Sequence, residues 1–258
     1  MTTSGRQTFR LTVAYLGAGF CGWQSQKNAA SPSLQAEIEK ALACVLDEKV
    51  RINASGRTDA GVHALGQVFA FQTTAHRSPE AIRSGLNSLL PESIRVCSAE
   101  KTSPDFHPQH CVRQKTYRYL IQNSRSASPF LRPFVWPFSE KLDTEKMRRA
   151  ADCLVGRHDF ASFQDSGRKA KDTVRTIFGL DVKKITDPVF QTEDLIEIRI
   201  TGEGFLYKMV RNIVGTLVEA GRGRLKPEAI KAVLKSRDRR KAGPTAPACG
   251  LTLLHVEY

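Results

Sequence analysis

The sequence contains no long apolar run. No stretch approaches the ~20 apolar residues that a membrane-spanning helix needs, and residues 1–10 show no apolar core of a signal peptide. With 41% hydrophobic and 25% charged residues over 258 positions, the composition is that of a soluble globular protein. We therefore expect a cytoplasmic protein without a membrane partner, long enough for one large or two ordinary domains.

The cysteines are scattered along the sequence. The six cysteines include no C-x-x-C pair, and a cytosolic chain of this length does not need disulfides. One cluster, His107-Pro-Gln-His110-Cys111, contains metal-ligand types, but Pro108 blocks the regular helix that would align them. No second pair of ligands answers this cluster elsewhere, so we expect no metal site.

Acidic residues are in deficit. Asp and Glu number 26 against 39 Lys and Arg, which gives a formal charge of +13. Residues 1–110 carry 11 basic and 9 acidic side chains, whereas the rest of the chain carries 28 and 17. Clustered cations bind nucleic acid by releasing counterions from phosphates. The alternative is a basic surface that only keeps the protein soluble, but the uneven distribution favours a binding face.

The hydrophobic pattern predicts two similar sets of elements. In the first part it predicts strands over 7–15, 50–54, 67–73 and 94–100, with helices from 33 to 48 and from 78 to 90. This β-α-β-β-α-β order is that of the ferredoxin-like unit. The second part repeats it loosely with an added helix: strands over 113–123, 176–186, 195–201 and 250–258, and helices over 143–154, from 205, and over 226–236. We expect an α+β protein with domains at 1–106 and 107–258.

One predicted turn concentrates chemically active residues. In Ser55-Gly-Arg57-Thr-Asp59-Ala-Gly61, two glycines bracket an aspartate, and glycine permits left-handed backbone angles or close approach to a ligand. Turns between strands often expose chemistry. Either the aspartate only hydrogen-bonds its own backbone, as in many hairpins, or it is a presented carboxylate with a cation two residues away.

Two later segments combine aromatic and cationic residues. Lys115, Tyr117 and Tyr119 share one face of a predicted strand, where a tyrosine beside cations suits base stacking or ordinary sheet packing. In 205–217 the apolar residues recur at every fourth position, so a helix packs by that stripe while Lys208 and Arg211 point elsewhere. An arginine on a largely apolar helix needs a carboxylate partner.

These three segments resemble the motifs of the TruA-type tRNA pseudouridine synthases, and the resemblance covers nearly the whole chain. It implies that Asp59 is the catalytic residue, as nucleophile or as base, that Tyr117 stacks on the target uracil, and that Arg211 pairs with Asp59. Arg57 is placed to enter the space that a flipped base leaves. Lys115 and Lys208 complete the substrate-binding candidates.

The resemblance also implies the activity and the architecture. The family converts uridine to pseudouridine in the tRNA anticodon arm, typically at positions 38, 39 and 40, without cofactor or metal and usually as a homodimer. It has two ferredoxin-like domains with merged antiparallel sheets and a central basic cleft. The alternatives are a synthase of the same fold acting at other RNA positions, or a non-catalytic tRNA-binding or chaperone protein. Intact Asp59, Tyr117 and Arg211 argue against the non-catalytic alternative.

Two basic segments supply candidates for contacts with the RNA backbone. The span 222–241 holds nine basic and two acidic residues, which is compatible with a phosphate-binding edge formed by Arg239, Arg240 and Lys241. The span 166–175 is either a solvated loop or an RNA clamp, and the net charge favours a clamp formed by Arg168, Lys169 and Lys171.

Two details of the motifs leave alternatives open. Phe20 and Trp23 lie in a Gly-rich segment that also resembles the family, and they fit structural support and RNA contact about equally. The family commonly has a basic residue two positions after the histidine of its Phe-His pair, whereas this chain has Gln109 after His107. A backbone contact that relatives make at this position is therefore not carried over to Gln109.

Overall fold

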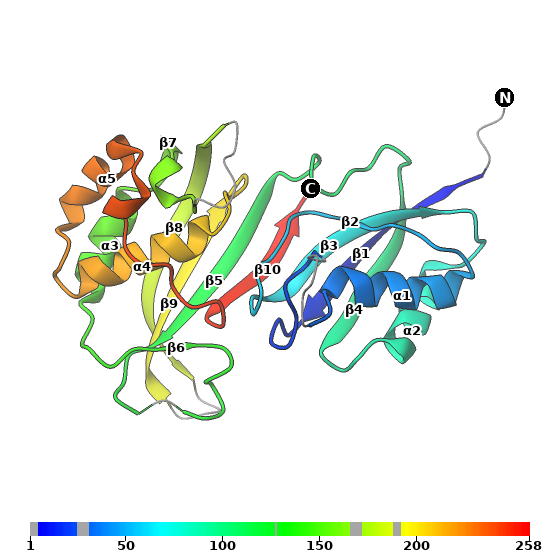
Figure 1. Cartoon of the computed structure of the whole chain (residues 1–258), viewed down its shortest axis with the longest axis horizontal. Coiled ribbons are helices and arrows are strands. Elements are labelled where there is room, and N and C mark those ends of the chain that lie inside the picture. Colours follow the sequence, from blue (N-terminus) through cyan, green and yellow to red (C-terminus); the bar gives the residue numbers. More distant parts are fainter. Residues whose placement is uncertain (1–4, 25–30, 127, 166–171, 188–191) are drawn as a thin grey trace. The chain divides into compact units, whose positions relative to one another are not determined.

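The computed structural model describes residues 5–24, 31–126, 128–165, 172–187 and 192–258 (Figure 1). The chain forms two compact units. Unit 1 contains the residues up to Arg113 together with Leu253–Tyr258, and unit 2 contains Gln114–Thr252. Both units combine helices with mostly antiparallel strands, which confirms the predicted α+β class. Within the described ranges, no helix is long and apolar enough to cross a membrane.

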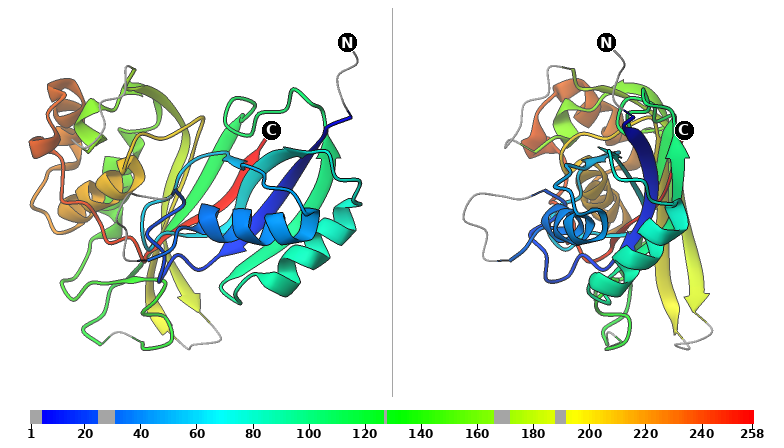
Figure 2. Two further views of the ribbon diagram at one scale, coloured as in Figure 1. Left: turned by 45° about the vertical axis from the view of Figure 1, so that its right-hand side comes forward. Right: turned by 90° about the vertical axis from the view of Figure 1, so that its right-hand side faces the viewer.

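Unit 1 has the order of elements that the hydrophobic pattern predicted. Its elements are β1 (Gln7–Tyr15), α1 (Leu34–Leu46), β2 (Asn53–Ala54), β3 (His63–Thr73), α2 (Pro79–Leu89) and β4 (Ile94–Thr102). Strand β1 pairs antiparallel with β3 and β4, and β2 pairs with β3. Helices α1 and α2 lie on one face of these strands (Figure 2). Both helices begin at a serine whose hydroxyl accepts a backbone N–H, Ser33 and Ser78.

The strands around the Asp59 turn differ in length from the prediction. The predicted strand over 50–54 is reduced to the two residues of β2, and β3 begins at His63 rather than at 67. The reason is the pairing of β1 with β3, which extends to Tyr15 opposite Ala64 past an irregularity in the register. The connection that carries Asp59 is therefore only residues 55–62.

The C-terminal residues complete unit 1. Arg113 donates its backbone N–H to the carbonyl oxygen of Glu257 at 2.8 Å, and the Tyr258 hydroxyl donates to the carbonyl oxygen of Pro108 at 2.9 Å. The Arg10 guanidinium carbon lies 5.4 Å from the ring centres of both Phe106 and Tyr258, a cation–π arrangement. The end of the chain is thereby fixed against residues that precede it by about 150 positions.

Unit 2 carries its elements in a longer series. They are β5 (Gln114–Gln122), β6 (Trp136–Pro137), α3 (Thr144–Asp152), β7 (Gly156–Asp159), β8 (Val174–Asp187), β9 (Thr192–Gly202), α4 (Met209–Gly221), α5 (Ile230–Ser236) and the start of β10 (Leu251–Glu257), with short 3-10 turns at Ala161–Phe163, Pro227–Ala229 and Arg239–Lys241. Strand β9 pairs antiparallel with β5 and β8, β8 pairs antiparallel with β7, and β6 runs parallel to β5.

Two helices of unit 2 begin later than the pattern predicted. Helix α4 starts at Met209 and not at 205, because Lys208 takes a left-handed backbone with φ of 57° that no α-helix continues through. The predicted helix over 226–236 consists of a 3-10 turn followed by α5 from Ile230. Helix α4 is buried along most of its length, and Gly221 packs against Met147 of α3.

Candidate active site

The connection between β2 and β3 is clamped at its base by one buried side chain. The Gln67 amide is fully buried; its Oε1 accepts from the Ser55 hydroxyl at 2.6 Å and from the Val68 N–H at 3.1 Å, and its Nε2 donates to the Gly56 carbonyl at 3.0 Å. Ser55 also donates its backbone N–H to the Val68 carbonyl at 2.8 Å. The first two residues of the turn therefore have one defined position.

A second anchor lies immediately before Asp59. The Thr58 hydroxyl is 2.8 Å from the Tyr15 hydroxyl, and the Thr58 carbonyl accepts from the Trp23 N–H at 3.0 Å. Burial raises the pKa of Tyr15 to about 12 despite hydrogen bonds that act in the other direction, so this hydroxyl keeps its proton at neutral pH. Trp23 is 2% exposed and packs near the rings of Tyr15 and Phe69. Trp23 therefore supports the fold.

Glycine in the Gly-rich segment allows its backbone to touch the Asp59 turn. A Cβ added to Gly22, whose φ is 106°, would lie 2.8 Å from the Thr58 carbonyl oxygen and 3.2 Å from the Asp59 carbonyl carbon. A Cβ on Gly17 would lie 2.1 Å from the Val62 carbonyl oxygen. The backbone of this segment thus packs directly against the turn. A residue with a Cβ in place of Gly17 or Gly22 would displace either the segment or the turn.

We expect Gly22→Ala to slow strongly the reaction that the resemblance implies, while leaving the rest of unit 1 folded. The left-handed backbone costs about 1–3 kcal/mol for a non-glycine residue, and the contact with Thr58 adds a shift of the turn itself. Gly19→Ala is the matched control, because Gly19 has φ of 85° but nothing within 4 Å of an added Cβ. Rates and melting temperatures of both variants should be measured. Equal losses in the two would show that the contact behind the turn has no role.

Asp59 itself is half-buried, and Arg57 is exposed. The Asp59 carbonyl oxygen accepts from the Val62 N–H at 3.2 Å, and Gly61 has φ of 80°, so the turn closes through the main chain. This closure uses main-chain atoms of Asp59, on a backbone that is fixed on both sides.

Tyr117 lies on β5 in unit 2, opposite Ile200 of β9. Its ring meets the Phe205 ring edge to face, with centres 5.3 Å apart and planes at 89°, which restricts its tilt. Lys115 lies two residues earlier on the same strand. Burial lowers the pKa of Lys115 to about 8, so this amine loses its charge more readily than an exposed lysine.

Arg211, in the first turn of α4, is fixed by the chain segment before β10. Its Nε donates to the Ala246 carbonyl oxygen at 2.8 Å, and the Ala246 N–H donates to the Arg211 carbonyl oxygen at 3.1 Å. This reciprocal pair sets the direction of the guanidinium, whose four remaining N–H groups are on the two Nη atoms.

The support for Ala246 was not found from the sequence. The Oδ1 atom of fully buried Asn212 accepts from Arg239 Nη2 at 2.9 Å and from the Thr245 hydroxyl at 2.6 Å. A Cβ on Gly215 would lie 1.7 Å from the Pro244 carbonyl oxygen, so the segment touches the backbone of α4. The glycine in the Arg-Asn-Ile-Val-Gly stretch was the available signal, but its partner is 29 residues away in the chain.

The Arg239 guanidinium makes several hydrogen bonds within unit 2. Besides Asn212 and Thr245, its guanidinium donates to the carbonyl oxygens of Ala242 and Gly243, and burial lowers its pKa. These internal hydrogen bonds stabilise the segment that fixes Arg211. Contact of Arg239 with the RNA backbone stays a prediction.

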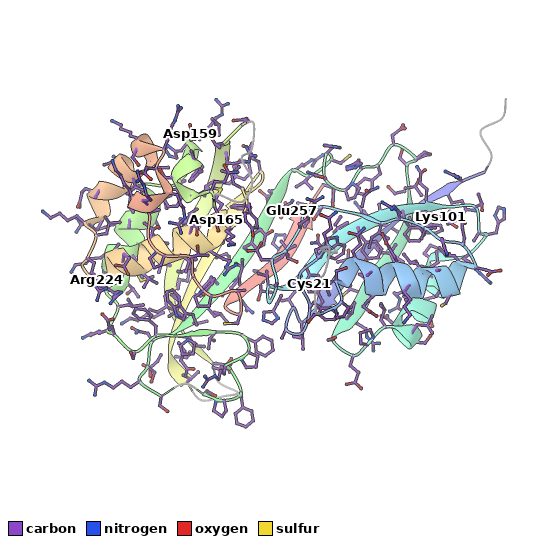
Figure 3. The ribbon with its side chains drawn as sticks, in the orientation of Figure 1. Cys21, Lys101, Asp159, Asp165, Arg224 and Glu257 are labelled. Atoms are coloured by element: carbon purple, nitrogen blue, oxygen red, sulfur yellow. The ribbon has the colours of Figure 1, made fainter. Side chains whose placement is uncertain are left out.

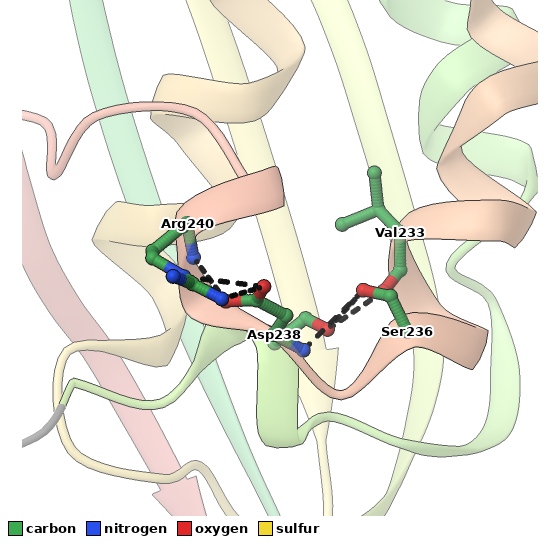
Figure 4. Close-up of polar contacts among 5 residues, drawn as sticks. Val233, Ser236, Asp238 and Arg240 are labelled. Atoms are coloured by element: carbon green, nitrogen blue, oxygen red, sulfur yellow. Dashed lines mark hydrogen bonds and ion pairs between the residues drawn. The ribbon is translucent and has the colours of Figure 1, made fainter.

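Arg240 and Lys241 remain exposed on the following turn. Asp238 caps this turn and accepts hydrogen bonds from the Arg240 side chain and backbone (Figure 4). The Arg240 hydrogen bonds hold the pKa of Asp238 at about 2. Arg168, Lys169 and Lys171 lie outside the described residues.

Lys208 is held by a carboxylate. Its Nζ donates to Asp165 Oδ2 at 2.6 Å and lies 5.1 Å from the centre of the Tyr207 ring. Asp165 lies beside the start of α4 (Figure 3). The Asp165 hydrogen bond raises the pKa of Lys208, so the ammonium stays charged at neutral pH.

The His107 cluster was the remaining candidate for a metal. The rings of His107 and His110 are 4.2 Å apart, and burial together with the neighbouring ring lowers the pKa of His107. Within the described part of the chain, no three His, Cys, Asp or Glu side chains are grouped as metal ligands. That the reaction needs no metal stays a prediction.

Comparison with known proteins identifies the class. A family model described as tRNA pseudouridine synthase matches residues 11–110 and 150–258, which is well over half of the chain. The chain belongs to the tRNA pseudouridine synthase family, and the protein is an isomerase. The resemblance inferred from the three motifs is confirmed.

Individual relatives agree with this class. A protein of Pelobacter propionicus named tRNA pseudouridine synthase A is 44% identical over 252 residues, covering 98% of this chain and 100% of the relative. A protein of the same name from Moorella thermoacetica is 45% identical over 249 residues, covering 96% and 98%. A chain of the solved Cbf5-Nop10-Gar1 complex superimposes with a TM-score of 0.39 at 12% identity, covering 95% of this chain and 48% of that one, too loosely to carry an argument.

Proposed function

We propose that the protein converts uridine to pseudouridine in the anticodon arm of tRNA, at positions 38, 39 and 40. The observation that carries this proposal is the match along the whole length of relatives named tRNA pseudouridine synthase A. The Asp59 turn adds support, since the protein holds it by Gln67, Tyr15 and two glycine contacts. Such precise support is expected of a residue that must meet a reacting atom.

In this proposal Asp59 is the catalytic residue. The reaction breaks the N1–C1′ glycosidic bond, rotates the uracil and forms a C5–C1′ bond, while the C5 proton leaves and N1 regains a proton. No atom is oxidised or reduced. The carboxylate acts as nucleophile at the sugar or as base on it. A base in a stem must first leave the stack, and we assign Arg57 to the vacated space.

The other residues hold the substrate and the carboxylate. Tyr117 stacks on the uracil, and its edge contact with Phe205 would keep the ring in one orientation. Arg211 pairs with Asp59, and the bond from its Nε to Ala246 would preorganise it for that task. Lys115 and Lys208 are further substrate contacts.

The architecture of the family extends the proposal. We propose two ferredoxin-like domains, 1–106 and 107–258, with merged sheets and a central basic cleft, in a cytoplasmic homodimer that acts on tRNA without cofactor or metal. The β-α-β-β-α-β order of unit 1 supports the first domain. The basic excess after residue 110 supports the cleft. Arg239, Arg240, Lys241 and the undescribed Arg168, Lys169 and Lys171 are its proposed contacts with the RNA backbone.

The test is a map of pseudouridine in defined tRNA. Purified protein is incubated with unmodified tRNA transcripts that carry uridine at positions 38, 39 or 40, and pseudouridine is located by carbodiimide labelling and primer extension. We expect modification at these positions and no signal in transcripts with cytidine there. Modification elsewhere would support a synthase with another target, and binding without modification would support a non-catalytic tRNA-binding protein.

A further inference from the structure

The ion pair between Lys208 and Asp165 is partly exposed, and its lysine has a left-handed backbone. Both side chains are about a quarter exposed, at 27% and 26%, and such pairs contribute little to stability. Lys208 also has a left-handed backbone, which costs free energy in a residue with a Cβ. Folding stability alone therefore does not account for a lysine in this conformation.

Positive charge gathers around this single carboxylate. Lys208 Nζ lies 2.6 Å from Asp165 Oδ2, the charge of Asp165 acts on the half-buried guanidinium of Arg239, and the charge of Arg211 acts on Lys208. No acidic residue lies in the first turn of α4. Asp165 thus balances the charge of Lys208, which lies three residues before Arg211, the proposed partner of Asp59.

A carboxylate oxygen and a phosphate oxygen make the same contact with an ammonium. Each is an anionic acceptor at about 2.7–2.9 Å, and the three N–H groups of a lysine select no particular anion geometry. The exposed Tyr207 ring lies next to the ammonium, at 5.1 Å, and offers a surface on which a nucleotide can stack.

We propose that Lys208 binds an RNA phosphate and that Asp165 is its internal competitor, occupying in the RNA-free protein the position that a phosphate oxygen takes in the complex. This inference rests on the proposed tRNA substrate. As long as Asp165 holds Lys208, the pair has no net charge and adds nothing to the attraction of RNA in general. Contact then forms only with an RNA held in place by other interactions, so the pair lowers the affinity for unselected RNA.

The test is whether RNA affinity rises or falls when the Asp165 carboxylate is removed. We expect Asp165→Asn to tighten binding of both unmodified tRNA and a polyuridine strand of equal length, by about threefold to tenfold at low salt. For polyuridine, which Lys208 does not contact in the unmodified protein, the slope of log affinity against log salt should steepen by about 0.7, since one more phosphate is neutralised. For tRNA, whose phosphate Lys208 already contacts, the slope should stay the same. Adding Lys208→Met to this variant should remove both changes.

The matched control is Asp181→Asn. Asp181 pairs with Lys183 at 2.8 Å in the same unit, so the control removes the same charge from the same kind of pair. An equal gain of RNA affinity in the control would show that the change in net charge alone causes the effect, and would overturn the proposal. Weaker RNA binding by folded Asp165→Asn would also overturn it, because the pair would then be structural.

A second variant covers the case in which Asp165→Asn does not fold. Lys208→Gln leaves the carboxylate without its lysine, and we expect weaker tRNA binding with a flatter salt slope. Unchanged binding by this variant would contradict the proposal. All of these are binding measurements, so they stand apart from the pseudouridine map: a wrong target position leaves this inference intact, and the inference can fail while the map is as expected.

Discussion

Asp59→Asn is expected to reduce pseudouridine formation by about 10³-fold or more, the scale on which loss of a catalytic nucleophile or base acts. The amide is nearly the same size as the carboxylate, but it can neither attack the sugar nor take its proton. Binding of tRNA should be kept, because removing a negative charge does not weaken contacts with phosphates. The rate is measured by tritium release from tRNA labelled at uracil C5, and the affinity in a separate titration.

Asp105→Asn is the control for this substitution. Asp105 is an exposed aspartate of the same unit, in the segment that follows β4, so the change in charge is identical. We expect its rate to equal that of the unmodified protein. Substantial turnover by Asp59→Asn would remove Asp59 from the catalytic role, and lost tRNA binding would show that the substitution disturbs the turn itself.

Arg211→Met is expected to reduce the rate by about 10²-fold, the cost of a catalytic group displaced by about 1 Å. Methionine keeps much of the side-chain bulk on α4 but removes both the cation and the Nε bond to Ala246. Arg211→Lys should recover little, because a single ammonium cannot bond to Ala246 and present two further nitrogen atoms. Single-turnover rates and melting temperatures of both variants give the comparison.

The same substitution at the other end of α4 provides the control. Arg222→Met removes an arginine that pairs with Glu140 and Glu219, away from Ala246. We expect that variant to lose some thermal stability and to keep its rate. If Arg211→Met kept the rate of the unmodified protein, Arg211 would be a packing residue and its pairing with Asp59 would be wrong.

The sequence by itself determined the elements of unit 1 and the family. Alternation in Gln7–Tyr15 and the serine caps of α1 and α2 are local effects, so a window of a few residues contains the information. The motifs around Asp59, Tyr117 and Arg211 are contiguous stretches and could be recognised without knowing what they contact.

Tertiary structure decided how the site residues are held. The sequence pattern predicted that α4 has a buried stripe, but it does not specify that Ala246 bonds to Arg211, or that Arg239 turns inward to Asn212 and leaves Arg240 exposed. Similarly, the sequence does not distinguish Gly22 from an ordinary loop glycine, and only the structure shows that it packs against Thr58. Periodicity indicates which face of an element is buried; the neighbour that covers it is set by packing between residues far apart in the chain.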